Sequence, residues 1–432
     1  MDWKNALAGK LVSPHDAVSG ISSGMRVVCG LTEPADLLTA LAKREDIRDV
    51  TVVDSVLVFG GAALATAGGR FRVIVGFATP VSYELQKNGL VEYIPLPFSQ
   101  AHRWVESQVN PHAVMVRLTP PDERGFCSYG WAPGFTPDLV KLAKDRGLPL
   151  IAEIDATMPY TISEEQVSVE ALTCAIECSG PPEGGDVPVL ASDKSGAIAV
   201  HLNPLVPDGA TLQVGIGSVP DTAVGLLMDK KDLGIHTEVL NEGLIDLMEA
   251  GVATGARKNF HPGKAVCTIS AISDRIGRFV DRNPDVLVMS SREALDPVTI
   301  ARNPAIRCIN SAFQVDLLGQ VNAETLGGFQ VAGVGGQLDF FRGAALNDDA
   351  LSIIVLDSTT SDESRSRIVP SFPPGSVVTS TRYDVDYIVT ENGAAQMRGR
   401  TTRERALALV SVAHEKFRDE LEKAARELSL LA

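Results

Sequence analysis

The sequence predicts an α/β protein with mostly parallel sheets, and two observations carry that prediction. Short apolar runs alternate with helical patterns along the whole chain. Strands that are joined through helices pair in parallel, which is the arrangement of α/β folds. A glycine–strand–glycine–proline unit also occurs twice, and two similar α/β halves would explain it.

Eight short apolar runs are predicted to be strands, because continuous apolar runs of this length are typical of strands covered on both faces. They are residues 50–53, 71–75, 113–116, 148–152, 267–270, 286–289, 352–356 and 387–390. Helical patterns lie between or after them, over residues 35–42, 138–145, 221–228 and 403–430.

The repeated unit places a glycine on each side of a strand and a proline at the entry to the next helix. Its first copy has Gly24, Gly30 and Pro34, and its second has Gly209, Gly215 and Pro220. Proline suits the first turn of a helix because its missing N–H is not needed there. Such units also arise by chance, so the repeat supports two domains without proving them.

The chain has 432 residues, which is too many for one ordinary core. Residues 180–186 are rich in glycine and proline and form the best linker candidate. We therefore predict an N-terminal domain over residues 1–185 and a C-terminal domain over residues 186–432.

Composition excludes some classes of function. The chain has 39 Lys and Arg against 54 Asp and Glu, a net charge of −15, which argues against nucleic acid as a partner. No apolar run approaches the roughly 20 residues that span a bilayer, and the first residues lack the pattern of a signal peptide, so we expect a cytoplasmic protein without a membrane partner. The six cysteines show no CxxC spacing and no histidine follows at ligand spacing, so no metal site is predicted.

Glu238 is the candidate nucleophile. It ends the segment Gly-Ile-His-Thr-Glu at 234–238, and Gly243 follows shortly after. A nucleophilic carboxylate must be exposed on one side, and backbone N–H groups must be able to approach the reacting carbonyl. The alternative is a surface glutamate at a helix start, the end of the dipole that carboxylates favour. His236 would share a face with Glu238 in a strand, either tuning the carboxylate or serving a structural role.

Two glycine-rich segments could bind a ligand. Residues 214–220 contain GxG but lack the third glycine and the downstream acid of a dinucleotide fingerprint. In residues 333–336, three glycines let the backbone approach a ligand or turn its N–H groups toward an anion, although a tight turn is the alternative. No GxxxxGK[ST] phosphate loop and no GxSxG elbow occurs.

Taken together, these segments resemble the acetyl-CoA hydrolase/transferase family of class I CoA-transferases, close to the 4-hydroxybutyrate CoA-transferases. The resemblance runs nearly the whole length and is densest in the second half. The matching segments are residues 208–213, 234–238, 310–321, 333–344, 366–370 and 390–391.

The resemblance implies two similar open α/β domains with mostly parallel sheets and the active site in the cleft between them. The family's catalytic glutamate falls on Glu238. The implied substrate- and CoA-binding residues are Val214, Gly215, Ile216, Gly217, Gly333, Gly335, Gly336, Gln337, Asp339 and Arg342. Coenzyme A enters as a substrate, no other cofactor is expected, and we expect a homodimer or a higher homo-oligomer.

The implied reaction moves CoA from a short acyl-CoA to a small carboxylic acid by ping-pong kinetics, through a glutamyl-CoA thioester. The acceptor would be 4-hydroxybutyrate, butyrate, acetate or a C4–C5 dicarboxylate such as succinate or itaconate, with Arg342 as a possible partner for a second carboxylate. Departures from the family pattern at Asp155, Glu242, Leu295 and Asn392 leave this preference open. Two alternatives stay open: an acetyl-CoA hydrolase that uses water, and a non-catalytic acyl-CoA-binding regulator.

Overall fold

The computed structural model describes residues 3–57, 60–180, 194–270 and 273–432. The chain forms two compact units. Unit 1 comprises Met1–Asp186 and Thr268–Glu293, and unit 2 comprises Val187–Cys267 and Ala294–Ala432. The predicted domain boundary, between residues 185 and 186, lies outside the described residues. No local sequence signal indicates that a segment after residue 267 returns to unit 1.

Unit 1 is built around a parallel sheet with helices between its strands. Its elements before the linker are α1 (Trp3–Ala6), α2 (Pro14–Ala17), β1 (Arg26–Cys29), α3 (Ala35–Ala42), β2 (Val50–Val53), α4 (Gly60–Ala65), β3 (Phe71–Val75), α5 (Pro80–Lys87), β4 (Glu92–Tyr93), α6 (Ala101–Trp104), β5 (Ala113–Leu118), β6 (Phe126–Cys127), α7 (Thr136–Arg146), β7 (Leu150–Ile154), β8 (Val167–Ser168) and β9 (Cys174–Glu177). The returning segment adds β14 (Ile269–Ser270), α11 (Asp274–Val280) and β15 (Val286–Val288). The boundary to unit 2, after Glu293, falls within α12 (Ser291–Ala294).

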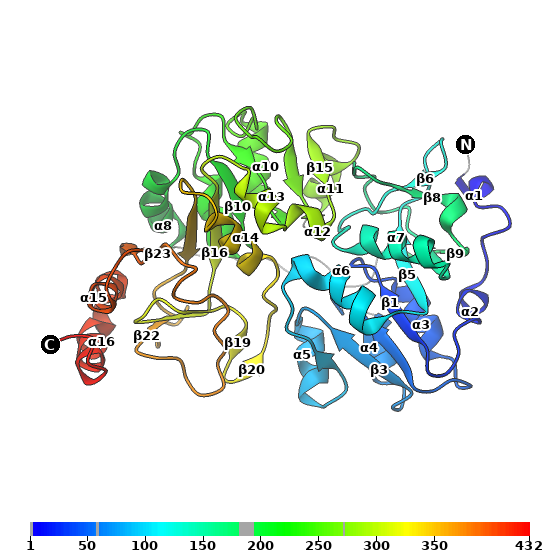
Figure 1. The fold of residues 1–432 in the computed structure, drawn as a ribbon, viewed down its shortest axis with the longest axis horizontal. Coiled ribbons are helices and arrows are strands. Elements are labelled where there is room, and N and C mark those ends of the chain that lie inside the picture. Colours follow the sequence, from blue (N-terminus) through cyan, green and yellow to red (C-terminus); the bar gives the residue numbers. More distant parts are fainter. Residues whose placement is uncertain (1–2, 58–59, 181–193, 271–272) are drawn as a thin grey trace. The chain divides into compact units, whose positions relative to one another are not determined.

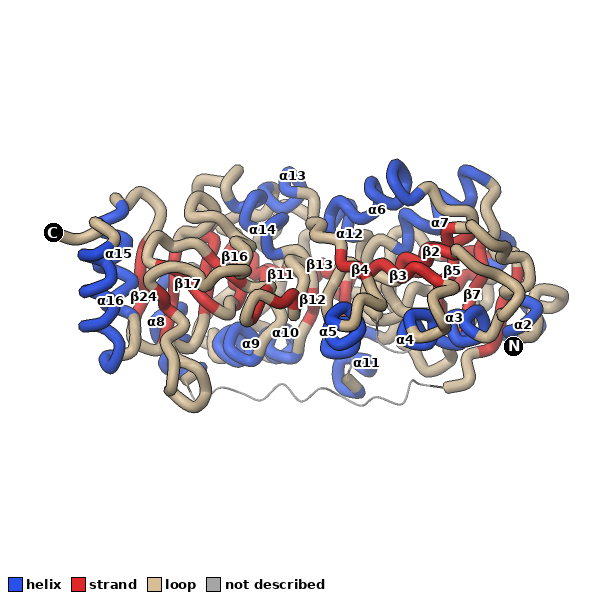
Figure 2. The backbone as a smooth tube through the Cα atoms, turned by 90° about the horizontal axis from the view of Figure 1, so that it is seen from below, coloured by secondary structure: helices blue, strands red, loops and turns tan. Residues whose placement is uncertain are grey.

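The unit 1 sheet has seven strands in the order β4-β3-β2-β1-β5-β7-β9, all paired in parallel. Alternate side chains of its strands enter two separate cores, because neighbouring residues in a strand point to opposite faces. Val28 and Val114 pack with Phe135 and Leu139 on one face. On the other face, the strand side chains pack with α3 and α4. Figures 1 and 2 show this doubly covered sheet.

Unit 2 has the same plan with more short strands. Its elements are α8 (Ser195–Leu202), β10 (Thr211–Val214), α9 (Ser218–Gly225), β11 (Gly234–Ile235), β12 (Val239–Leu240), α10 (Glu242–Glu249), β13 (Ala265–Cys267), α13 (Pro297–Ala301), β16 (Arg307–Ser311), β17 (Gln314–Asp316), β18 (Val321–Asn322), β19 (Thr325–Leu326), β20 (Phe329–Gln330), α14 (Gln337–Ala344), β21 (Leu351–Val355), β22 (Ile368–Val369), β23 (Tyr387–Thr390), β24 (Gly393–Gln396), α15 (Thr402–Val412) and α16 (Glu415–Glu427).

The unit 2 sheet has six strands in the order β11-β10-β16-β21-β23-β24. Only β24 runs antiparallel, as the edge partner of β23. Figure 2 shows α13 and α14 on one side of this sheet and α9 and α10 on the other. The strand order reverses between β10 and β16, and ligands of open α/β sheets bind at the carboxyl edge beside such a reversal.

The prediction of an α/β protein with mainly parallel sheets is confirmed. The two strands of the repeated unit become β1 and β10, each beside the point where its sheet reverses order. Three predicted elements differ. The run at 267–270 is interrupted at Thr268, the helix expected at 221–228 begins at Ser218, and the long helix expected at 403–430 ends at Val412 before a second one starts at Glu415.

Candidate active site

The candidate site lies at the carboxyl edge of the unit 2 sheet. Strand β10 ends at Val214, β11 at Ile235 and β16 at Ser311, so the residues that follow these parallel strands emerge on one edge. Helix α14 enters from the same edge, because a crossover helix begins where the preceding strand of a parallel pair has ended. The glycine-rich segment before α14 therefore meets the residues after β11.

Glu238 lies in the bend between β11 and β12, and its side chain is partly buried. The backbone N–H of Gly336 donates a hydrogen bond of 2.8 Å to its Oε2 atom. Gly336 immediately precedes the first residue of α14, so the carboxylate also faces the positive end of that helix. Helix α10 begins only at Glu242, so Glu238 does not start a helix.

A side chain at either of the two glycines next to Glu238 would push its carboxylate away. A Cβ atom on Gly336 would lie 2.9 Å from Glu238 Oε2, and one on Gly335 would lie 3.2 Å from both carboxylate oxygens. Gly335 also has a φ of +53°, a conformation that glycine adopts without strain. The same glycines therefore form the turn before α14 and let the backbone approach the Glu238 carboxylate. Gly333 lies in the loop that leads into this turn.

The pKa of Glu238 is raised from 4.5 to about 7. Burial is the main cause, since removing a carboxylate from water favours its neutral form. The Gly336 N–H opposes the shift, and the charge of Asp339 adds to it. The carboxyl group is therefore divided between its acidic and nucleophilic forms near neutral pH.

The segment after β10 is joined to the Glu238 segment through Thr237. The Thr237 Oγ1 atom lies 3.1 Å from both the N–H and the carbonyl oxygen of Val214. Gly215 continues the strand, and a Cβ atom there would lie 2.4 Å from the Asn310 side chain. Ile216 is exposed, and Gly217 has a φ of +146°.

Three expected binding residues on α14 differ in placement. Asp339 is buried in the first turn and affects Glu238 through its charge. Gln337 is buried and donates to the Ser380 hydroxyl at 2.9 Å, so its amide is engaged away from Glu238. Arg342 is exposed in the last turn, about 9 Å along the helix axis from Gly336. The structure thus brings Gly335, Gly336 and Asp339 to Glu238, whereas the Gln337 amide bonds to Ser380 and Arg342 lies in the last turn of the helix.

His236 faces the core rather than the carboxylate. It is fully buried, and its Nε2 atom lies 2.7 Å from the carbonyl oxygen of Ala294. Its Nδ1 atom lies 2.7 Å from the side-chain amide of Asn303. Sequence reasoning found neither Asn303 nor the contact with Ala294, because both come from distant parts of the chain. Thr237 is part of the Gly-Ile-His-Thr-Glu segment, but the sequence spacing does not predict its hydrogen bonds to Val214.

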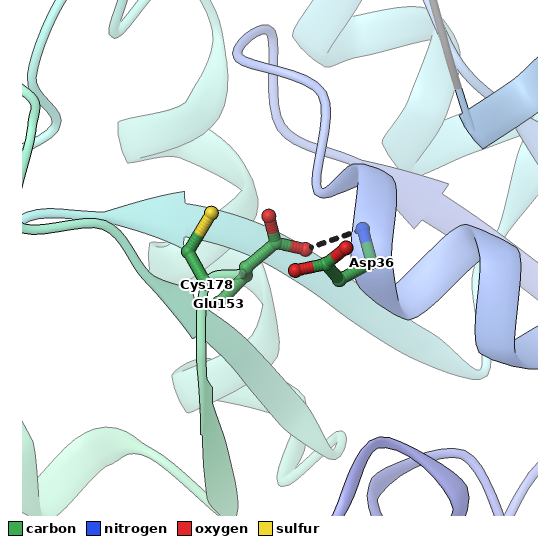
Figure 3. A group of neighbouring side chains, drawn as sticks. All are labelled: Asp36, Glu153 and Cys178. Carbon is green, nitrogen blue, oxygen red and sulfur yellow. Dashed lines mark hydrogen bonds between the residues drawn. The ribbon is translucent and has the colours of Figure 1, made fainter. Parts of the chain in front are cut away.

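A second polar group lies in unit 1, at the carboxyl edge of its sheet (Figure 3). Possible ligand atoms of Asp36, Glu153 and Cys178 all lie within 4.8 Å of one another. Glu153 Oε2 accepts from the N–H groups of Asp36 and Leu37 at the start of α3. Arg117 lies 3.1 Å from Cys178 Sγ and 3.6 Å from Glu153 Oε1. Its guanidinium already supplies the positive charge that a metal would bring.

Comparison with known proteins gives concordant similarities. The family model described as the acetyl-CoA hydrolase/transferase C-terminal domain matches residues 273–425. The chain is 36% identical to the 4-hydroxybutyrate coenzyme A transferase of Clostridium kluyveri over 98% of each chain. It is 31% identical to the butyryl-CoA:acetate CoA-transferase of Anaerostipes caccae over 100% of this chain and 99% of that one. Among solved structures, RipA from Yersinia pestis matches with a TM-score of 0.92 at 33% identity over all of both chains.

Within the described residues, no helix has both the length and the apolar character needed to cross a membrane.

Proposed function

The chain belongs to the acetyl-CoA hydrolase/transferase family and is a CoA-transferase acting between short acyl-CoAs and carboxylates. We propose that Glu238 is the covalent nucleophile of this transfer. One observation supports this role above all. A backbone N–H, that of Gly336, is held 2.8 Å from one carboxylate oxygen, while the other oxygen has no Cβ atom beside it at Gly335.

The first half-reaction follows from what a carboxylate does to a thioester. The free Glu238 oxygen attacks the acyl carbonyl carbon, the carbon–sulfur bond breaks, and CoA leaves as a thiolate. The product is a mixed anhydride between Glu238 and the acyl group. The thiolate then attacks Cδ of Glu238, the bond from Cδ to the bridging oxygen breaks, and the free acid leaves. Glu238 now holds CoA as a thioester.

The second half-reaction reverses these steps with a new acid. The acceptor carboxylate attacks Cδ of the thioester and expels the CoA thiolate, which gives a second mixed anhydride. The thiolate attacks the acceptor's acyl carbon, and Glu238 leaves as a carboxylate. One thioester is exchanged for another, so the cycle needs no ATP.

The Gly336 N–H serves the two attacks that occur at Cδ itself. In each, negative charge develops on the Glu238 oxygen that is not in the bridge. That oxygen is the Oε2 position, which already faces the donor. A fixed donor of this kind typically contributes about 3–4 kcal/mol to a transition state. The N-terminus of α14 adds a favourable dipole.

The proposed acceptor is a short acid. The named reactions of the relatives involve 4-hydroxybutyrate, butyryl-CoA and acetate. We extend the acceptor range to C4–C5 dicarboxylates such as succinate or itaconate, although Arg342 stands well away from Glu238. An acetyl-CoA hydrolase is the alternative, and water would then resolve the anhydride or the enzyme thioester.

Two measurements test the proposal. Incubation with acyl-CoA and no acceptor is expected to leave CoA on the protein by intact-mass spectrometry, and hydroxylamine is expected to release it. Glu238→Ala should give neither adduct nor transfer. A panel of acetyl-, butyryl- and succinyl-CoA crossed with small mono- and dicarboxylates then identifies the pair. Net loss of thioester without any acceptor would favour the hydrolase, and no adduct in the wild type would refute the covalent role.

A further inference from the structure

We infer that His236 and Asn303 are positioning residues, which hold Glu238 against the N–H of Gly336 without taking part in the bond changes. The inference rests on the proposed role of Glu238 as the nucleophile. It assigns a task to the buried histidine of the Gly-Ile-His-Thr-Glu segment that is different from tuning the carboxylate by charge.

The hydrogen bonds of His236 fix its tautomer. A carbonyl oxygen only accepts, so the 2.7 Å contact with Ala294 requires the proton to be on Nε2. Nδ1 then accepts from the Asn303 amide at 2.7 Å. That amide nitrogen also donates to the carbonyl oxygen of Ile300 at 3.2 Å, which fixes the orientation of the Asn303 side chain. Each partner is therefore held in one arrangement.

Packing holds the imidazole ring as well. It stacks on Phe260 at 5.5 Å between centroids and meets Phe340 edge to face at 5.9 Å. Burial lowers the pKa of His236 to about 3, with the charges of Lys258 and His261 acting in the same direction. The ring is neutral at physiological pH, so its contribution is geometric.

These contacts form a continuous chain of residues within unit 2. Asn303 follows α13, and α13 packs against α14 at Gly343, where a Cβ atom would lie 2.5 Å from Ile300 Cγ2. Helix α14 begins directly after Gly336, which donates to Glu238. Glu238 is two residues from His236. The nucleophile and its donor are thus the two ends of one chain of contacts that passes through His236 and Asn303.

The opposite side of the segment is anchored separately. Thr237 bonds to Val214, and the buried Lys258 ammonium donates to the carbonyl oxygens of Ile235 and Lys264, each at 2.7 Å. The residues before and at 237 therefore keep their place when the His236 ring loses a partner. The other end of the chain of contacts, α13 with α14, is then the part that moves, so the expected effect of such a loss is a shift of α14 and its Gly336 N–H relative to Glu238.

A displacement between Glu238 and the Gly336 N–H has two measurable consequences. Misplacing a reacting group by about 1 Å lowers a rate by up to about 100-fold. Loss of the Gly336 hydrogen bond also removes an interaction that lowers the carboxyl pKa, so the acidic limb of kcat/KM moves to higher pH. Asp339 also acts on Glu238 from α14, but its charge effect is longer-ranged and changes less over about 1 Å than the hydrogen bond does. A defect confined to stability changes neither the limb nor the single-turnover rate of folded protein.

The test uses three variants and a control. His236→Gln keeps a donor near Ala294 and loses the acceptor for Asn303, His236→Asn does the reverse, and Asn303→Ala removes the second partner. Thr401→Ala is the control, because it deletes the N-cap of α15 and lowers stability in the same unit. CoA-adduct formation in a single turnover and the pH profile of kcat/KM are measured on folded protein.

We expect adduct formation to slow about 10- to 100-fold in the three variants, with the acidic limb displaced upward, and neither change in Thr401→Ala. Wild-type adduct rates and an unmoved limb in folded His236→Gln or Asn303→Ala would overturn the inference. A wild type that forms no adduct would instead refute the role of Glu238. A second test needs no variant: ¹⁵N NMR of histidine-labelled wild type should show one ring as the Nε2–H tautomer down to about pH 5. Titration of every histidine above that pH would also overturn the inference.

Discussion

The N–H of Gly336 and the Oε2 atom of Glu238 lie 2.8 Å apart, although 98 residues separate them in the chain. This contact divides the two carboxylate oxygens into different roles. Oε2 is held by a donor at the start of α14, and Oε1 is the oxygen that attacks in the proposed mechanism. Because burial raises the pKa of the same carboxyl to about 7, its ionisation becomes the first quantity to test.

Transfer activity should rise with pH through about 7. Only the ionised carboxylate attacks a thioester, and burial holds the pKa of Glu238 near that value rather than near 4.5. We expect kcat/KM for acyl-CoA to increase roughly tenfold per pH unit below the midpoint and to level off above it. A profile that is flat from about pH 5 to about pH 8 would contradict this assignment.

Asp339→Asn should move that midpoint to lower pH. Asp339 is buried in the first turn of α14, and its negative charge raises the pKa of Glu238. Its removal makes the ionised form of Glu238 easier to reach, so activity at about pH 6 should increase relative to the plateau. Asp229→Asn is the matched control, because Asp229 is an exposed carboxylate of the same unit. An unchanged midpoint in Asp339→Asn would show that its charge does not act on Glu238.

Glu238→Gln should stabilise the folded protein at alkaline pH. In the wild type the folded pKa lies above the unfolded one, so the unfolded state releases its proton first and stability falls as pH rises from about 4.5 to about 7. The amide has no proton to lose. Because Glu238 is partly exposed, we expect a gain of about 1–2 kcal/mol at pH 8 and little gain at pH 4. Urea unfolding at the two pH values measures the difference, and an equal effect at both would contradict the linkage.

Much of the fold could be predicted from the sequence, because its signals are local. The run at 387–390 and the helix at 35–42 appear with the predicted bounds, since apolar periodicity marks them directly. The break between α15 and α16 escaped prediction. There the His414 side chain caps a new helix, and the apolar period continues on both sides. The segment Thr268–Glu293 joined unit 1 without any local signal.

In the candidate site, too, some features have a local sequence signal and others depend on the folded chain. The resemblance assigned Glu238 and the glycines to one site, and the structure places Gly335 and Gly336 beside Glu238. Their binding of CoA stays a prediction. The resemblance did not indicate that Gln337 turns toward Ser380. Asn303 escaped notice because its partner, His236, is 67 residues away and only the folded chain brings them together.

Gly336→Ala should remove most of the activity while leaving the fold intact. Gly336 has a φ of −92°, so alanine costs no backbone strain there. Its Cβ atom would nevertheless lie 2.9 Å from Glu238 Oε2, 3.2 Å from Glu238 Cδ and 3.3 Å from Leu295 Cδ1. The carboxylate must then move away from the N–H that holds it. We expect kcat to fall by about 100-fold or more, with loss of a fixed oxyanion donor as the main cause.

The matched control for that variant is Gly196→Ala. Gly196 lies within α8, and a Cβ atom added there would meet nothing within 4 Å. Gly196 lies in the first turn of α8, where alanine is favoured over glycine by less than the value of about 1 kcal/mol in a helix interior, so this variant should be as active as the wild type and no less stable. Thermal unfolding and kcat are measured for both. If Gly336→Ala kept wild-type kcat, or lost stability and activity in parallel, the glycine would be serving the turn alone. Loss of kcat with an unchanged unfolding midpoint shows instead that position 336 must lack a side chain because Glu238 reacts beside it.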